Sequence, residues 1–233
     1  MTKKTYIKKG NKGNWRKAVV VGATALLASG AFWSIKTINN KIVVPSYRAL
    51  RVIDGDTFET TERQLVRLTG INAPDEGNCG YDESSESLKK LVMNRNLYLK
   101  VIFRDRTNRL VAHVYNENGL VSTQMTKLGM AYYSGEGLKD EETRLRANEA
   151  KEKGVGIFGE KCTQHENKVN PKCVIKGNIR IGGDGRQYRF PGCGEYNSTI
   201  IQLYMGDSWF CSEKEAVEAG FTKGSDCFKK VWK

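Results

Sequence analysis

Residues 52–76 begin with Val-Ile-Asp-Gly-Asp-Thr and end with Arg-Leu-Thr-Gly-Ile-Asn-Ala-Pro-Asp-Glu, two polar clusters set between apolar segments. The Asp-Gly-Asp sequence at residues 54–56 predicts a hairpin turn, because Asp bonds nearby backbone amides and Gly accepts a positive φ. The alternation of residues 66–71 predicts a half-buried strand, and Pro74 prevents that strand from continuing inside a sheet. We therefore expect Asp56 at a strand start and the polar groups around Pro74 at an irregular strand end.

The side chains at these two places suit metal and phosphate chemistry. Carboxylate and carbonyl oxygens gathered at a strand end are the donors that a hard cation such as calcium prefers. Arg67, further back in the second strand, suits a phosphate because its guanidinium can bind two oxygens together. An isolated Asp-Gly-Asp is usually only a solvated turn, so this interpretation depends on both clusters.

A third cluster, Asp-Arg-Thr-Asn-Arg at residues 105–109, precedes another strand-like segment at residues 110–115. Taken in this order, the three clusters resemble the staphylococcal nuclease (thermonuclease) family. The resemblance runs from about residue 47 to residue 162, roughly half of the chain. It implies an α+β fold, namely a five-stranded OB-fold barrel with three helices, and calcium-dependent hydrolysis of phosphodiester bonds.

The resemblance also implies roles for single residues. Calcium would be held by three of them: Asp56, Asn72, and Ala73 through its backbone carbonyl. Arg67 and Arg109 would clamp the phosphate, and Asp75 stands where the family usually carries a glutamate that activates water. A phosphodiester needs these groups because its transition state gathers negative charge on oxygen.

This chain departs from the family pattern beside Pro74. Asn72 replaces an Asp, which removes one negative charge from the ion site, so we expect weaker calcium binding. Asp75 is one methylene shorter than Glu and reaches less far, so we expect slower turnover, with Glu76 as the alternative base. Ala73 replaces a Thr, and a backbone ligand survives that change.

Four further residues carry weaker signals. By resemblance, Arg106 and Tyr133 would surround the terminal phosphate of a bound nucleotide, while the alternatives are a solvated Arg and a half-buried Tyr. His113 lies within a strand-like segment and His165 in a polar stretch, and neither has a partner at metal-binding spacing. We therefore interpret both histidines as structural or exposed.

Periodicity by itself predicts an α+β chain. The expected strands are residues 47–53, 57–61, 64–71, 97–103 and 110–115. The expected helices are residues 82–94, 122–128 and 141–153, the last closed by Gly154 at its C-terminal cap. With a helix between the third and fourth strands, this order is that of an OB-like barrel with helical additions, which assigns a nuclease-like domain to residues 47–165.

The net charge of +12 is unevenly distributed. Residues 1–45 hold nine of the 38 Lys and Arg and no acid, which leaves 29 bases against all 26 acids in the remainder. The bulk charge therefore concerns topology, and attraction of an anionic substrate must come from locally placed Arg and Lys.

An uncharged run at residues 18–35 follows Arg16 and Lys17. The basic start, the length of the run and its small residues predict export. Two outcomes stay open: a signal peptide cleaved before Ala31, or a membrane anchor with its basic end in the cytoplasm. Residues 1–35 form this segment and residues 36–46 an exposed linker.

The C-terminal part is rich in cysteine. After a polar linker at residues 166–172, residues 173–233 predict a small α+β domain, with a helix opened by a capping box at residues 212–215. It resembles modules appended to exported bacterial nucleases, and also the zinc-binding domain of the Ada DNA-repair protein. The six cysteines are Cys79, Cys162, Cys173, Cys193, Cys211 and Cys227. No C-x-x-C pair is present, so we favour disulfides over zinc, and we hypothesise a Cys79–Cys162 bond.

These observations lead to one main hypothesis and two rivals. The main hypothesis is an exported, monomeric nuclease, either secreted or membrane-anchored, that uses Ca²⁺ to hydrolyse DNA, with RNA as a second candidate substrate. By resemblance, it would leave 3′-phosphate ends. The first rival is an OB-fold module that binds nucleic acid or protein without chemistry, and the second is a membrane-attached interaction protein acting through its Cys-rich end.

Overall fold

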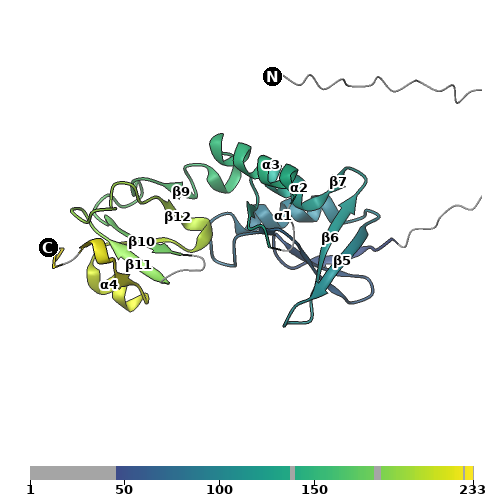
Figure 1. Ribbon diagram of the computed structural model, residues 1–233, viewed down its shortest axis with the longest axis horizontal. Coiled ribbons are helices and arrows are strands. Elements are labelled where there is room, and N and C mark those ends of the chain that lie inside the picture. Colours follow the sequence, from purple (N-terminus) through teal and green to yellow (C-terminus); the bar gives the residue numbers. More distant parts are fainter. Residues whose placement is uncertain (1–45, 137–139, 181–184, 228, 233) are drawn as a thin grey trace, which may run out of the picture. The chain divides into compact units, whose positions relative to one another are not determined.

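The structure, a computed structural model, describes residues 46–136, 140–180, 185–227 and 229–232 (Figure 1). Residues 44–233 form one compact unit. The expected signal segment at residues 1–35 and nearly all of the linker at residues 36–46 lie outside the described residues. Among the residues that are described, no helix combines the length and the apolar character needed to cross a lipid bilayer.

The largest sheet has five strands along one continuous order and a short sixth strand paired to one of them. Its members are β1 (Ala49–Val52), β2 (Thr57–Thr60), β3 (Leu65–Leu68), β5 (Tyr98–Arg104), β6 (Leu110–Asn116) and β7 (Gly119–Leu120). The order is β1-β2-β3-β6-β5, with β7 paired to β6, and only β3 and β6 run parallel. Two backbone hydrogen bonds between Tyr47 and Leu97 join the segments that precede β1 and β5. The α+β class is confirmed, and the strand count exceeds the five expected.

The strand expected at residues 64–71 is wrong in its extent, because the chain turns at its end. Gly70 has a φ of +79°, a conformation that ends β3 at Leu68. The next two residues form β4 (Ile71–Asn72), which pairs with β8 (Tyr132–Tyr133) outside the main sheet. Arg67 and Asn72 therefore belong to different sheets although only four residues separate them.

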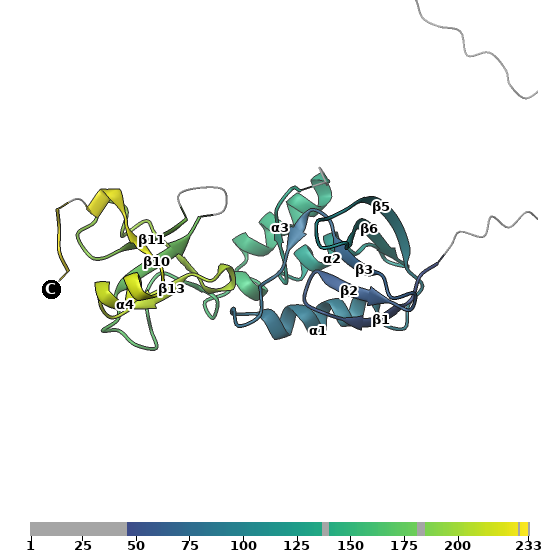
Figure 2. The same ribbon diagram turned by 90° about the horizontal axis from the view of Figure 1, so that it is seen from below.

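The three expected helices are present. They are α1 (Tyr81–Val92), α2 (Val121–Lys127) and α3 (Glu141–Glu152). Helices α1 and α2 contact the main sheet, and α3 packs against α2. Helix α1 ends two residues earlier than predicted, since Asn94 takes a φ of +58°. Its buried Leu88 and Val92 join Phe58 and Leu68 of the sheet in one core. Figure 2 shows α1 running along the side of the sheet formed by β1 and β2.

The C-terminal part has a four-stranded sheet of its own. Its order is β13 (Ser208–Phe210), β10 (Ile175–Ile179), β11 (Arg186–Arg189), β14 (Thr222–Lys223). Helix α4 (Glu213–Glu218) begins at the expected cap, where Ser212 Oγ accepts a hydrogen bond from the Glu215 amide at 3.2 Å. A second core of buried aromatic and apolar residues, including Phe190, Phe210 and Phe221, lies between these elements.

All six cysteines form disulfides, so the zinc alternative has no thiolate to use. The pairs are Cys79–Cys162, Cys173–Cys211 and Cys193–Cys227. The first pair is the one hypothesised from the sequence. Strand β12 (Ile201–Gln202) pairs with β9 (Thr163–Gln164) beside it, and Leu203 bonds the backbone of both Cys162 and Cys79. The loop after Pro74 is thus attached to residues far along the chain.

Breaking the Cys79–Cys162 bond is expected to destabilise the protein. The two cysteines are 83 residues apart, so the bond removes much loop-closure entropy from the unfolded chain. In the chain-entropy picture the double substitution C79S/C162S lowers the free energy of unfolding by about 4 kcal/mol. Urea denaturation measures this loss. Each single substitution should cost as much as the pair, and an unchanged midpoint for the double variant would contradict the expectation.

Candidate functional site

The turn at residues 54–56 is pressed against the start of α1. The Asp56 amide donates to Asp54 Oδ1 at 2.9 Å, which closes the turn. Gly55 has no room for a side chain, since an added Cβ would overlap Ser84 and lie 2.6 Å from the Cβ of Ala73. The turn, helix α1 and the segment before Pro74 therefore meet at Gly55, which places the carboxylates of the turn next to Ala73.

Asp56 is the centre of this meeting point. Its side chain is only 6% exposed, and both carboxylate oxygens are used. Oδ1 accepts hydrogen bonds from Arg67 and from Thr57 Oγ1 at 2.9 Å, while Oδ2 accepts one from the Ala73 amide at 3.0 Å. Arg67 also donates to Asn72 Oδ1 at 2.6 Å. Four of the residues selected from the sequence, Asp56, Arg67, Asn72 and Ala73, are thus in direct contact.

Two neighbours of this cluster were not selected from the sequence. Burial raises the pKa of Asp54, and the negative charge of Asp56 raises it further. Burial also raises the pKa of Tyr132, against the effect of a hydrogen bond from Asn72. Asp54 lies within the quoted turn and was available as a signal, whereas the position of Tyr132 depends on the β4–β8 pairing.

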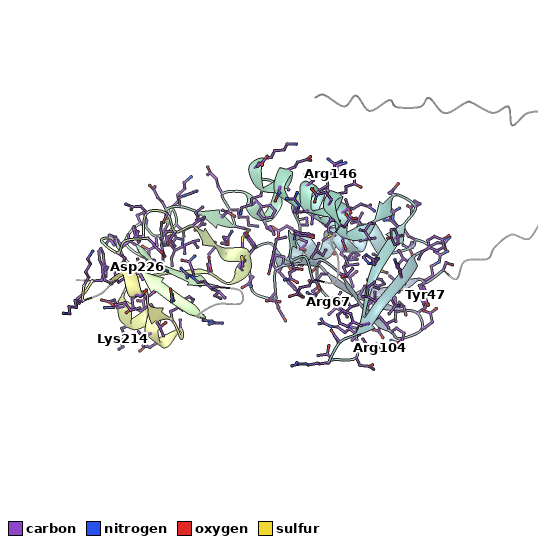
Figure 3. The ribbon with its side chains drawn as sticks, in the orientation of Figure 1. Tyr47, Arg67, Arg104, Arg146, Lys214 and Asp226 are labelled. Carbon is purple, nitrogen blue, oxygen red and sulfur yellow. A yellow bond between two sulfur atoms is a disulfide. The ribbon has the colours of Figure 1, made fainter. Side chains whose placement is uncertain are left out.

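A pocket of about 280 Å³ opens beside Arg67, and Arg109 lines it as well. The other residues of its wall are Leu68, Thr69, Gly70, Ile71, Phe103, Asp105, Val111, Ser134 and Glu136. Arg67 comes from β3 and Arg109 from the turn before β6, so two guanidinium groups from separate segments reach one hollow. Figure 3 labels Arg67 in the lower part of this domain.

Arg109 is held in place by Asp105. Its Nε donates to Asp105 Oδ2 at 2.7 Å and its amide to Asp105 Oδ1 at 3.0 Å. The turn between them is closed by Asn108, which has a φ of +64°. Burial alone would raise the pKa of Asp105, but hydrogen bonds from Arg109 and Thr107 outweigh it and hold that pKa far below its usual range. Asp105 therefore stays ionised, which orients the guanidinium beside the pocket.

The remaining predicted residues lie further out. Asp75 and Glu76 are both exposed, and the negative charge of Asp75 contributes to the raised pKa of Tyr132. Arg106 is exposed at the tip of the turn at residues 105–109, outside the wall of the pocket. Tyr133 is half-buried and pairs with Ile71.

Neither histidine joins the cluster. His113 lies in β6, where burial lowers its pKa and the charge of Lys100 lowers it further. Its buried Nδ1 has no hydrogen-bond partner among the described residues. His165 lines two other hollows near residues 160–176. These positions agree with the interpretation of both side chains as structural or exposed.

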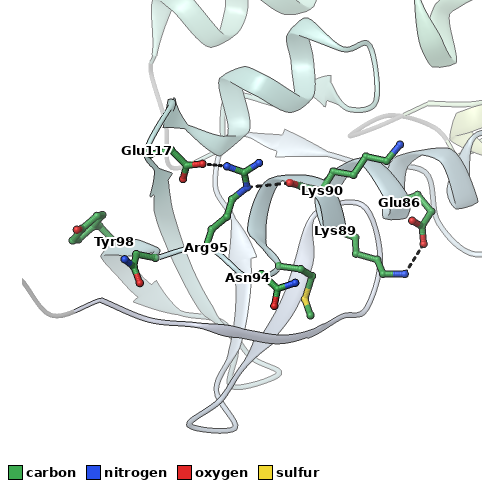
Figure 4. Close-up of a pocket in the computed structure, with 9 residues that line it drawn as sticks. Glu86, Lys89, Lys90, Asn94, Arg95, Tyr98 and Glu117 are labelled. Carbon is green, nitrogen blue, oxygen red and sulfur yellow. Dashed lines mark hydrogen bonds and ion pairs between the residues drawn. The ribbon is translucent and has the colours of Figure 1, made fainter.

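A larger hollow of about 820 Å³ lies at the C-terminal end of α1 (Figure 4). Its cations are largely neutralised: Arg95 pairs with Glu117 and donates to the Lys90 carbonyl, and Lys89 pairs with Glu86 at 2.9 Å. Because this hollow is open and most of its charges are paired, we interpret it as a solvent-filled surface depression. The smaller pocket beside Arg67 carries the chemical groups that can act on an anion.

The oxygen donors around Asp56 fit a hard cation. Asp54 and Asp56 place two carboxyl groups in one turn, and the raised pKa of Asp54 reflects their mutual repulsion as well as burial. A divalent cation beside them would relieve that repulsion. Asp56 Oδ2 accepts a single hydrogen bond and keeps one lone pair for such an ion, and Asn72 offers a neutral oxygen.

Comparison with known proteins identifies the central region. The family described as staphylococcal nuclease homologue matches residues 65–160. An uncharacterized endonuclease of Escherichia coli O157:H7 is 28% identical over 117 residues, which cover 48% of this chain and 76% of that protein. An uncharacterized endonuclease of Haemophilus influenzae is equally similar over 66% of its length. A staphylococcal-like nuclease of Arabidopsis thaliana is 27% identical over 121 residues, or 52% of this chain and 37% of that protein.

Asp54 is expected to make stability depend on pH. Because its pKa is raised, the folded protein binds a proton that the unfolded chain has lost, so stability falls as pH rises above the ordinary value of 3.8. Asn at position 54 can still accept a hydrogen bond from the Asp56 amide, but its side chain does not ionise. Urea denaturation between pH 3.5 and 7, without divalent ions, should show D54N gaining on the wild type as pH rises.

The matched control is D82N, at an exposed position in the first turn of α1. It should not reproduce the pH-dependent gain of D54N. Stability curves for D54N and the wild type that stay parallel across this pH range would reject the assignment of the titration to Asp54.

Proposed function

Residues 65–160 make this chain a member of the staphylococcal nuclease family, and we propose that it is a calcium-dependent nuclease that hydrolyses phosphodiester bonds of DNA and also of RNA. One observation carries the proposal. Arg67 and Arg109, from different segments, line one small pocket, and Arg67 is bonded to the oxygen-rich cluster of Asp56 and Asn72. An OB-fold module that only binds its ligand, without chemistry, does not need that combination of groups.

The family uses a metal ion, and we propose Ca²⁺ for this chain. Asp56, Asn72 and the Ala73 carbonyl would hold the ion, and Asp54 lies in the same turn as Asp56. When bound, the ion would withdraw charge from a phosphate oxygen and bind the attacking water. Carboxylate, amide and carbonyl oxygens favour calcium over softer metals, which prefer imidazole or thiolate ligands. Because Asn72 is neutral, the site carries less negative charge, which lowers its affinity for Ca²⁺.

The two arginines stabilise the phosphate as it gains charge. Arg67 shares its guanidinium with Asp56 and Asn72, so it is fixed before a substrate arrives. Arg109 is fixed in the same way by Asp105. Donors that are oriented in advance need no rearrangement in the transition state, which is when they contribute most. Each arginine is therefore expected to act on turnover more than on substrate affinity.

Asp75 is the proposed base for the attacking water. Asp75 is exposed in the loop that follows Asn72, directly after Pro74. Asp75 would take a proton from water, and the resulting hydroxide would attack phosphorus. The P–O5′ bond would break, leaving a 3′-phosphate and a 5′ oxygen that takes up a proton to become a hydroxyl. Glu76, equally exposed, is the alternative base.

The proposed setting is outside the cytoplasm. The basic N-terminus followed by an uncharged run supports export, either as a secreted protein or attached to a membrane by residues 18–35. Three disulfides support an oxidising compartment. We propose a monomer whose partner is its nucleic-acid substrate.

Loss of either arginine is expected to remove most of the activity. On a DNA plasmid with calcium, R67A and R109A should each lower turnover by about 10² to 10³, the usual effect of removing one oriented donor. EDTA should abolish cleavage by the wild type. The matched control is R146A on α3, outside the pocket, which should cleave like the wild type (Figure 3). Cleavage that survives both EDTA and R67A would overturn the mechanism, and wild-type inactivity with every divalent ion would favour a binding module.

The identity of the base can be tested by side-chain length. D75E restores the longer reach that the family usually has and is expected to raise kcat several-fold, whereas D75A should lower it by about 10² to 10⁴, the range for losing a general base. The pH profile of kcat distinguishes loss of a base from misfolding, because only the former removes the acidic limb. E76A serves as the control. If E76A is the variant that loses this limb, Glu76 is the base.

A further inference from the structure

Strand β5 contains an irregularity next to the pocket. Its pairing with β6 joins Leu99 to Val114 and Val101 to Ala112, and then skips one residue before joining Phe103 to Val111. Ile102 is the extra residue of a β-bulge. In unbroken register Ile102 would face Val111, and Phe103 would face Leu110. The bulge therefore shifts Phe103 by one position relative to β6.

That shift changes the face of the sheet to which Phe103 belongs. Leu110, Ala112 and Val114 face the buried core of the domain. A side chain paired with Leu110 would point into that core, whereas one paired with Val111 points to the opposite face, because neighbouring residues of a strand alternate. A large apolar side chain has thus been turned away from the core that it would otherwise fill.

On this outer face Phe103 lies in one row with Arg67. Val111 pairs with Phe103 on one side and with Arg67 of β3 on the other. Strands lie about 4.8 Å apart, so the backbones at Phe103 and Arg67 are roughly 10 Å apart across the sheet. Both side chains line the same pocket, and 49% of Phe103 is exposed. An uncovered ring therefore stands beside the two guanidinium groups.

We propose that Phe103 is a stacking platform for the nucleobase next to the phosphate held by Arg67 and Arg109. The proposal rests on the nuclease function proposed above, and it adds Phe103 as a residue that positions the substrate. A base in a regular duplex already stacks on its neighbours and presents no free face to a protein ring. Phe103 therefore contacts a base only where that base is unpaired, and it has no preference among the bases, since each has a flat face that can stack.

The test uses short fluorescent oligodeoxynucleotides with one cleavable linkage, the others being methylphosphonates. One has normal bases, two carry an abasic residue on either side of that linkage, and one is fully annealed. For F103A and F103L we expect kcat/KM on the normal single strand to fall about 5- to 150-fold, the equivalent of one lost base stack. F103W and F103Y, which keep a ring, should stay close to the wild type.

One of the two abasic oligonucleotides should remove the difference between F103A and the wild type, because the ring then has no base to contact. The control I102A changes the exposed bulge residue beside Phe103 and should leave all rates near the wild type. Equal rates for F103L and the wild type on the normal single strand, or equal losses by F103A on every oligonucleotide, would overturn the platform.

A binding measurement separates this proposal from the nuclease function. Fluorescence anisotropy with an all-methylphosphonate strand carrying one uncleavable phosphorothioate at the central linkage needs no turnover. If the wild type cleaves nothing but F103A binds this strand at least 5-fold more weakly, the nuclease function fails while the platform stands. If the wild type cleaves DNA and F103A neither binds nor cleaves differently, only the platform fails.

Discussion

The buried carboxylate of Asp56 is the constraint on which the rest of the site depends. A carboxylate removed from water is costly unless donors replace the lost hydration. Three donors do so here, from the guanidinium of Arg67, the hydroxyl of Thr57 and the amide of Ala73. Because these groups come from the hairpin, the third strand and the segment before Pro74, satisfying one charge fixes three pieces of chain together. The same arrangement leaves oxygen atoms and a guanidinium side by side, which suits a cation and an anion in adjacent positions.

The second support of the site comes from residues beyond the region that matches the family. Leu203 bonds the backbone beside both ends of the Cys79–Cys162 disulfide. The neighbouring Tyr204 ring packs at 5.7 Å from the ring of Tyr132, which in turn receives a hydrogen bond from Asn72. A continuous set of contacts thus links the Cys-rich part to Asn72, one of the proposed ion ligands. This gives the C-terminal part a structural role in holding the loop after Pro74.

Much of the fold could be predicted because it rests on local interactions. The turn at residues 54–56, the cap at Ser212 and the helix at residues 141–152 follow from residues within one turn of each other. The contact of Asp56, Arg67, Asn72 and Ala73 was also anticipated, although through a family resemblance rather than through periodicity. The prediction of one strand over residues 64–71 was wrong in its extent, because the apolar alternation continues through Gly70 whereas the extended backbone is interrupted there.

By itself, then, the sequence determined the α+β class, the turn residues and the chemical types gathered near Pro74, because propensity and spacing act over a few residues. Only the tertiary structure decided that Asp54 is buried enough to raise its pKa and that Phe103 lines the pocket where Arg67 and Arg109, paired beforehand only through the family resemblance, lie together. The physical reason is the same in each case. Burial, register and the position of a bulge depend on how partner segments pack, which local propensity does not encode, and a single bulge reverses the face of every side chain beyond it.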